Sequence, residues 1–178
     1  MRGGAFPSLS TVVVRIHMNY WIITDTHFGH AKMQEYCGRP EGFENKIIKN
    51  TLRTCKPGDV LIHLGDICIG DDEKWHDLFT YHVSAKLWLI RGNHDKKSAS
   101  WYLGHGWDCV ADEMLLDMFG KRILFTHRPT TEPLFDLNIH GHHHNTGHHP
   151  EDATTSKHRL VFIEHEYSPI NLRRIVES

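Results

Sequence analysis

Five short apolar runs in this chain of 178 residues each end in residue types that bind metal ions or transfer protons. One run, Trp88-Leu89-Ile90, leads through Arg91 into Gly92-Asn93-His94-Asp95. The polar residues that follow the other four runs are Asp25-Thr26-His27, Gly65-Asp66, His127 and His140–His144. A Gly-Asn turn after a strand is common on its own, but five repetitions of one pattern indicate that these polar ends meet at a single site.

The spacing of these residues suits transition-metal chelation. In an extended segment residues i and i+2 point the same way, so Asp25 and His27 can chelate one ion. Carboxylate and imidazole ligands favour zinc, manganese or iron over calcium. The alternative for Asp25 is a cap on the next helix, and for the histidine tract a low-complexity surface stretch or a tag. The alternation of His142 and His144 after Gly141 favours metal binding.

The first half of the chain reads as alternating strands and helices. Apolar runs predict strands at 20–24, 60–64 and 86–91. Amphipathic patterns between them predict helices at 43–55 and from Asp71 onward. Such β-α-β units give parallel strands joined by right-handed crossovers. The polar residues at the carboxyl ends of these strands can therefore meet at one edge of the sheet.

The second half is expected to be mostly antiparallel. Residues 110–118 and 121–126, joined by Phe119-Gly120, predict a β-hairpin. Late strands are expected at 160–163 and 170–175. Together the two halves predict an α/β fold of two packed, mixed sheets flanked by helices.

Length and composition set outer limits. The chain suits one domain without repeats or linkers, so residues 18–178 are interpreted as a single domain and 1–17 as an N-terminal extension. The net charge of -2 gives no overall attraction to nucleic acids or membranes. No apolar stretch reaches the length of a membrane span. Four cysteines without paired spacing indicate reduced thiols in a cytoplasmic protein.

The motifs, taken together and in order, resemble those of one known family. The chain is similar to the calcineurin-like metallophosphoesterase superfamily, and especially to its small, cap-less bacterial and phage members. The resemblance runs from residue 20 to the C-terminal strands and implies a four-layer α-β-β-α sandwich. The motifs that carry it are Asp25-Thr26-His27-Phe28-Gly29-His30, Arg39-Pro40, His63-Leu64-Gly65-Asp66, Gly92-Asn93-His94-Asp95, His127 and Gly141-His142-x-His144.

The resemblance implies a site for two metal ions. Two ions about 3.5–4 Å apart can share a hydroxide, lower its pKa and hold a phosphate for in-line attack. Manganese is expected first, with iron, zinc or nickel as alternatives. The implied ligands are Asp25, His27 and His144 for one ion, Asn93, His127 and His142 for the other, and Asp66 for both.

His94 resembles the catalytic histidine of the family and would protonate the leaving oxygen. In the family's phosphoprotein phosphatases, an aspartate three residues after the bridging one orients this histidine, but the position here is Ile69. Either Asp71 or a backbone carbonyl then fixes the tautomer of His94, or acid catalysis is weaker. The departure argues against protein phosphatase activity and favours substrates with good leaving groups or activated diesters.

Arg39, Arg128 and His30 are candidates for substrate contacts. A guanidinium can bind two phosphate oxygens at once, and His30 could touch substrate or support a ligand. The alternative for each arginine is a solvated surface charge. Since the chain has no long insertion to form a cap, an open site is expected, which suits a small phosphate ester or a nucleotide-like substrate.

Two other functions fit the sequence less well. A nuclease acting on DNA or RNA would be expected to carry a basic stripe or an accessory binding segment, and this sequence has neither. A non-catalytic protein-interaction scaffold would be expected to have lost site residues, whereas His94 and the implied ligands are all present. The sequence leaves the oligomeric state open.

Overall fold

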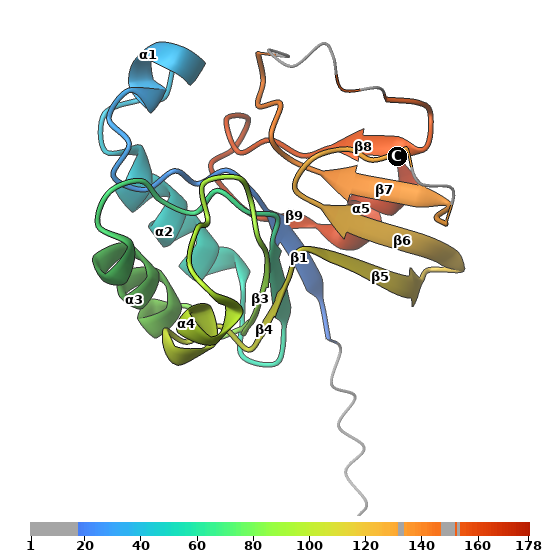
Figure 1. Ribbon diagram of the computed structural model, residues 1–178, viewed down its shortest axis with the longest axis horizontal. Coiled ribbons are helices and arrows are strands. Elements are labelled where there is room, and N and C mark those ends of the chain that lie inside the picture. Colours follow the sequence, from blue (N-terminus) through green and yellow to red (C-terminus); the bar gives the residue numbers. More distant parts are fainter. Residues whose placement is uncertain (1–17, 132–133, 147–151, 153) are drawn as a thin grey trace, which may run out of the picture.

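Two β-sheets pack against each other in the computed structural model, which describes residues 18–131, 134–146, 152 and 154–178 (Figure 1). The strands of the first sheet, in spatial order, are β4 (Cys109–Ala111), β3 (Lys86–Ile90), β2 (Val60–His63), β1 (Tyr20–Ile23) and β9 (Ile170–Asn171). Those of the second are β5 (Glu113–Met118), β6 (Lys121–Thr126), β7 (Leu137–His140) and β8 (His158–Leu160). The predicted extension, residues 1–17, lies outside the described residues.

Both sheets are mixed. In the first sheet β1 to β4 run parallel and β9 runs antiparallel to β1. In the second, β5 is antiparallel to β6, and β6, β7 and β8 are parallel. The helices are α1 (Met33–Cys37), α2 (Phe43–Thr54), α3 (Asp72–His82), α4 (Ala99–Gly104) and α5 (Leu172–Glu177). The prediction of an α/β fold with two mixed sheets and flanking helices is confirmed.

Two apolar clusters hold these layers together. On β2, Leu61 points toward the helices and packs with Phe43 of α2 and Phe79 of α3. Its neighbour Ile62 points the other way and packs with Phe125 of the second sheet. This alternation, expected for a strand buried on both faces, fixes β2 between the helical layer and the second sheet.

Among the described helices, none is long and apolar enough to cross a membrane.

Two predictions about the second half were wrong. Val110 and Ala111 do not belong to the hairpin but lie in β4, which pairs with β3 in the first sheet. The hairpin starts at Glu113 and turns through Phe119 and Gly120, both with positive φ, as a two-residue turn of the favoured kind requires. The second sheet is also mainly parallel, because β7 and β8 enter it through long connections and not through hairpins.

The last predicted strand was wrong as well. Only Ile170 and Asn171 are extended, and α5 follows directly. The side chain of Asn171 accepts a hydrogen bond from the backbone N–H of Arg173, which caps the helix. Buried Leu172, Ile175 and Val176 then recur at helical spacing on one face of α5, in the cluster between the two sheets.

Candidate metal centre

Asp66 lies at the centre of the site. One of its carboxylate oxygens, Oδ2, is 3.3 Å from Nε2 of His127, 3.8 Å from Nε2 of His27 and 3.9 Å from Nε2 of His94. The other oxygen, Oδ1, accepts a 2.8 Å hydrogen bond from the backbone N–H of His94. A single buried carboxylate therefore faces imidazoles that come from three different strand ends.

The first ligand group consists of Asp25, His27 and His144, whose donor atoms lie within 4.8 Å of one another. Oδ1 of Asp25 is 3.8 Å from Nε2 of each histidine. Its other oxygen, Oδ2, accepts hydrogen bonds from the hydroxyl of Thr24 and the backbone N–H of His142. Oδ1 is buried and has no hydrogen-bond partner among the described residues, so it is available to a metal ion.

The second ligand group consists of Asp66, His127 and His142, again with donor atoms within 4.8 Å. Nδ1 of His127 donates a 2.7 Å hydrogen bond to the carbonyl of Leu64, which leaves Nε2 as the ligand atom. This Nε2 lies 3.1 Å from Nδ1 of His142 and 3.1 Å from Oδ1 of Asn93. A hydrogen bond from the ring to a carbonyl is the usual way in which proteins orient a metal-binding histidine.

These observations fit a pair of transition-metal ions. The structure brings together at one site all seven residues for which metal ligation was predicted, and both groups mix carboxylate with imidazole, a donor set that suits zinc, manganese or iron. The lone Oδ1 atom of Asp25 would be costly to bury without a partner. Asp66 faces both groups, as a shared ligand must.

Backbone strain is concentrated at this site. The described residues include seven non-glycine positions with positive φ. Five of them carry predicted ligands: Asp25 (50°), His27 (46°), Asp66 (57°), His142 (68°) and His144 (48°). This conformation is uncommon outside glycine and costs of order 1–3 kcal/mol per residue. Because most of these positions carry predicted ligands, the placement of the ligand side chains, and not stability, accounts for the backbone conformation here.

Gly141 packs against the first ligand group. A Cβ at this position would overlap with the hydroxyl of Thr24 and with Oδ2 of Asp25. We predict that Gly141→Ala lowers the affinity for one metal ion by roughly 10- to 100-fold, because Asp25 must shift. The matched control is Gly104→Ala, where no atom lies within 4 Å of the new Cβ. Calorimetric titration with manganese would contradict the prediction if both variants bound two ions with unchanged affinity.

Arg39 stabilises the candidate site through hydrogen bonds and does not line its cavity. Its side chain is fully buried and donates hydrogen bonds to the carbonyls of Asp25 and Thr26 and to Oε1 of Glu164. The same Oε1 accepts a 3.0 Å hydrogen bond from Nδ1 of His144. The expectation that Arg39 contacts substrate is therefore corrected: its donors are occupied, and through Glu164 it connects one strand end to His144, a predicted metal ligand.

We predict that Glu164→Gln lowers both the stability of the fold and its affinity for a metal ion. The buried guanidinium of Arg39 would lose its counterion, which should cost roughly 3–5 kcal/mol of unfolding free energy. His144 would lose its carboxylate partner, which should lower metal affinity by about 10- to 100-fold. Asp112→Asn is the matched control, because it removes the partner of Arg91 from a 2.6 Å ion pair in which Asp112 is 75% exposed. Equal small effects of both variants in urea unfolding and metal titration would contradict the prediction.

Asp95 holds two loops of the site together. Its carboxylate accepts hydrogen bonds from the backbone N–H groups of Asp66, Ile67 and Gly92. Asp95 was recognisable from the sequence only as part of a motif, without a role, and Glu164 was not predicted to belong to the site. A signal was present, since Glu164 directly follows the apolar run 160–163, as the ligands follow theirs.

A cavity of about 650 Å³ opens above the two ligand groups. Arg128 and His30, both predicted to touch substrate, line it, whereas Arg39 is not among its lining residues. The His94 side chain is 46% exposed and also faces this cavity. Asp71 does not orient His94: its carboxylate accepts a hydrogen bond from the backbone N–H of Lys74 and caps α3. The backbone N–H of His94 instead donates to Asp66, and its ring makes an edge contact with the ring of His27.

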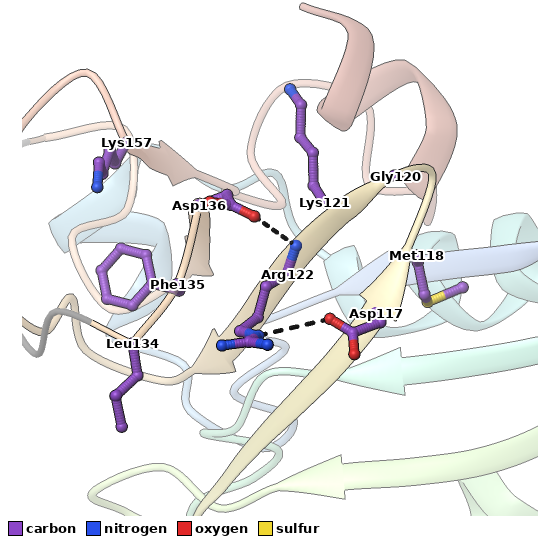
Figure 2. Close-up of a pocket in the computed structure, with 9 residues that line it drawn as sticks. All are labelled: Asp117, Met118, Gly120, Lys121, Arg122, Leu134, Phe135, Asp136 and Lys157. Atoms are coloured by element: carbon purple, nitrogen blue, oxygen red, sulfur yellow. Dashed lines mark hydrogen bonds and ion pairs between the residues drawn. The ribbon is translucent and has the colours of Figure 1, made fainter.

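A second hollow, of about 710 Å³, lies at the β5–β6 hairpin (Figure 2). The backbone N–H of Arg122 donates to Asp136, and the guanidinium of Arg122 pairs with Asp117 at 3.5 Å. Its nine lining residues are Asp117, Met118, Gly120, Lys121, Arg122, Leu134, Phe135, Asp136 and Lys157. None of these residues is a histidine or cysteine, and none of them is a predicted site residue.

One histidine in each ligand group has a raised pKa. Burial alone would lower the pKa of His127, but its hydrogen bond to Asp66 and the charges of Asp25 and Asp66 raise it to about 9. Burial would likewise lower the pKa of His144, whereas its hydrogen bonds to Cys37 and Glu164 raise it to about 10. Both imidazoles are therefore protonated at neutral pH in the metal-free protein.

Metal binding should consequently release protons. Ions bind only the neutral imidazole, so His127 and His144 must each lose a proton, and affinity should rise with pH up to about 9 to 10. The stability of the metal-free fold should change in the opposite direction. The raised pKa values of His127 and His144 stabilise the fold below about pH 6.5, and this contribution is lost as the pH rises through 9 to 10. Manganese titrations near pH 7.5 in buffers of different ionisation enthalpy should show release of about two protons. Release of none would contradict the assignment.

The chain matches one known protein family and is similar to several known proteins. The sequence model of the family described as calcineurin-like phosphoesterase matches residues 18–172. The uncharacterized protein MJ1445 of Methanocaldococcus jannaschii is 26% identical over 169 residues, covering 88% of this chain and 89% of that protein. The crystal structure of AQ665 from Aquifex aeolicus, a protein of unknown function, is similar with a TM-score of 0.73 and 28% identity, covering 90% of this chain and 99% of that one. An archaeal phosphodiesterase gives a TM-score of 0.46 at 16% identity, with 82% of each chain covered.

Proposed function

Because the chain belongs to the calcineurin-like phosphoesterase family, we propose that it is a hydrolase that cleaves small phosphate esters, diesters in particular, with two divalent metal ions. The observation that carries the proposal is the position of Asp66, whose Oδ2 faces both ligand groups beneath an open cavity. We propose manganese as the working ion, since the carboxylate and amide oxygens of the predicted ligands suit it.

When bound, the ions would activate a water molecule for in-line attack and neutralise charge on the phosphate. Asp66 would hold them at a fixed separation through its single carboxylate. Its Oδ1 atom accepts a hydrogen bond from the backbone N–H of His94, which ties the loop that carries the proposed proton donor to the shared ligand.

His94 is proposed as the general acid. Its ring faces the cavity, and its Nε2 lies 3.9 Å from Oδ2 of Asp66, next to the expected position of the substrate. An imidazole there can give its proton to the leaving oxygen, which contributes roughly 100- to 10,000-fold to the rate. Arg128 and His30 line the same cavity and are proposed to bind the non-reacting phosphate oxygens.

The cavity also bears on the substrate class. Met33, Tyr36 and Cys37 of α1 form one wall, and Arg128 contributes a positive charge. A cavity of about 650 Å³ with one apolar wall suits a small organic phosphate better than a polymer backbone. We therefore propose a small diester or nucleotide-like substrate.

The proposal is tested with chelated protein refilled with manganese. An aryl phosphodiester and the matching monoester are compared as substrates, and we expect metal-dependent turnover with the diester preferred. Preference for the monoester would change the reaction class. Tight, salt-sensitive binding and cleavage of oligonucleotides would favour a nuclease instead, and absence of turnover with both esters and oligonucleotides would count against catalysis.

A further inference from the structure

Three side chains beside the first ligand group form another cluster of metal-binding type. The donor atoms of Cys37, His144 and Glu164 lie within 4.8 Å of one another. Cys37 is the last residue of α1 and a free thiol, and it lines the cavity, so an ion can reach it from solvent. A thiol has no part in the proposed hydrolysis, which leaves its position next to a metal-binding histidine unexplained.

Glu164 has a carboxylate oxygen that the fold does not use. Its Oε1 accepts hydrogen bonds from Arg39 and His144. Its Oε2 is buried and has no hydrogen-bond partner in the described part of the chain, although the side chain is only 2% exposed. Buried carboxylate oxygens are normally paired. Glu164 therefore adds a carboxylate with one unpaired oxygen to a cluster that also contains sulfur and nitrogen donors.

We propose that Cys37, Glu164 and His144 form an inhibitory binding site for one thiophilic divalent cation of the zinc class. Thiolate ligands select zinc-like ions, whereas manganese prefers oxygen and nitrogen donors. Arg39 forms an ion pair with Glu164, and its positive charge opposes cation binding at the cluster. The thiolate of Cys37 is therefore needed for affinity. The inhibitory effect rests on the proposed function, while ion binding at the cluster does not.

His144 cannot serve this cluster and the first ligand group at the same time. Its Nε2 faces Asp25, and its Nδ1 faces Glu164. A neutral imidazole carries one proton and offers one lone pair. Coordination through Nδ1 leaves the ring proton on Nε2, so the second proton of the imidazolium and the proton of the Cys37 thiol both go to solvent. Asp25 and His27 then lose their third ligand, so occupation of the cluster weakens the binding of one catalytic ion.

The binding is tested with cadmium, because a cadmium–thiolate bond gives a near-ultraviolet charge-transfer absorption. Chelated full-length protein is titrated with cadmium, beside Cys37→Ser, Cys37→Ala and the control Cys109→Ser, whose half-buried thiol lies on β4. We expect the wild type and Cys109→Ser to show the absorption band and both Cys37 variants to lack it. The same band in a folded Cys37 variant, checked by circular dichroism, would overturn the proposal, and so would its absence from the wild type.

The inhibition is tested with zinc added to manganese-loaded protein, each variant being compared with its own uninhibited rate. Zinc should inhibit the wild type and Cys109→Ser at concentrations at least 10-fold lower than those needed for Cys37→Ser. Equal sensitivity of the two cysteine variants would overturn the inhibitory role. If the protein hydrolyses no ester at all, the proposed function fails, but the cadmium absorption still decides whether Cys37 binds the ion.

Discussion

Asp66→Asn is expected to abolish the metal-dependent activity, with a loss of roughly 1,000-fold or more. Lewis-acid stabilisation of the transition state is worth several kcal/mol, and about 1.4 kcal/mol corresponds to a factor of ten. Asparagine is suited to the test because it has nearly the same shape and tolerates the left-handed backbone that Asp66 adopts, with φ 57°. The variant therefore removes the charge while keeping the loop.

The metal content separates this effect from misfolding. Asp66→Asn should bind fewer than two ions, since both ligand groups lose the carboxylate that faces them. Asp59→Asn is the matched control: Asp59 is 4% exposed, directly precedes β2, and accepts hydrogen bonds from Trp21 and Lys56. Its replacement should lower stability but leave two ions and activity. Full activity and two tightly bound ions in Asp66→Asn would show that this carboxylate does not bridge.

His94→Ala is expected to lower turnover by roughly 100- to 10,000-fold while both ions stay bound. The ring belongs to neither ligand group, so its loss removes a proton donor and leaves the metal ligands in place. The effect should be larger for an alkyl leaving group than for an aryl one, because a good leaving group departs without protonation. His165→Ala, at a side chain 72% exposed, is the control.

Two outcomes would speak against acid catalysis by His94. An equal loss with alkyl and aryl leaving groups would mean that the ring positions substrate and does not transfer the proton. Loss of an ion from His94→Ala would mean that the ring is a metal ligand. Metal ligation by His94 is a real alternative to test, because its Nε2 lies only 3.9 Å from Oδ2 of Asp66.

The strands that deliver the site could be predicted from sequence. Each of β1, β2 and β3 was predicted to within one residue at its carboxyl end, because strands buried on both faces appear as uninterrupted apolar runs. The segment 170–175 was mistaken for a strand because Ile170 and Leu172 alternate. The decisive feature was the capping side chain of Asn171, which starts a helix there.

Longer-range relationships could not be read from local patterns. The parallel pairing of β6, β7 and β8 joins segments through extended connections, and no hairpin turn marks their register. Arg39 was predicted to meet substrate because a guanidinium can bind two phosphate oxygens, but it is buried and pairs with Glu164, which is 125 residues away. Residues that support a site through such contacts leave little local signal, whereas ligands at strand ends leave a clear one.

The most direct test of the account is the stoichiometry and spacing of bound manganese in chelated wild-type protein. Titration followed by electron paramagnetic resonance should reveal two ions per chain with a spin-coupled spectrum, because two ions that share Asp66 lie about 3.5–4 Å apart. The coupling should be absent from Asp66→Asn. One ion, two uncoupled ions, or none in the wild type would contradict a dinuclear centre built around Asp66.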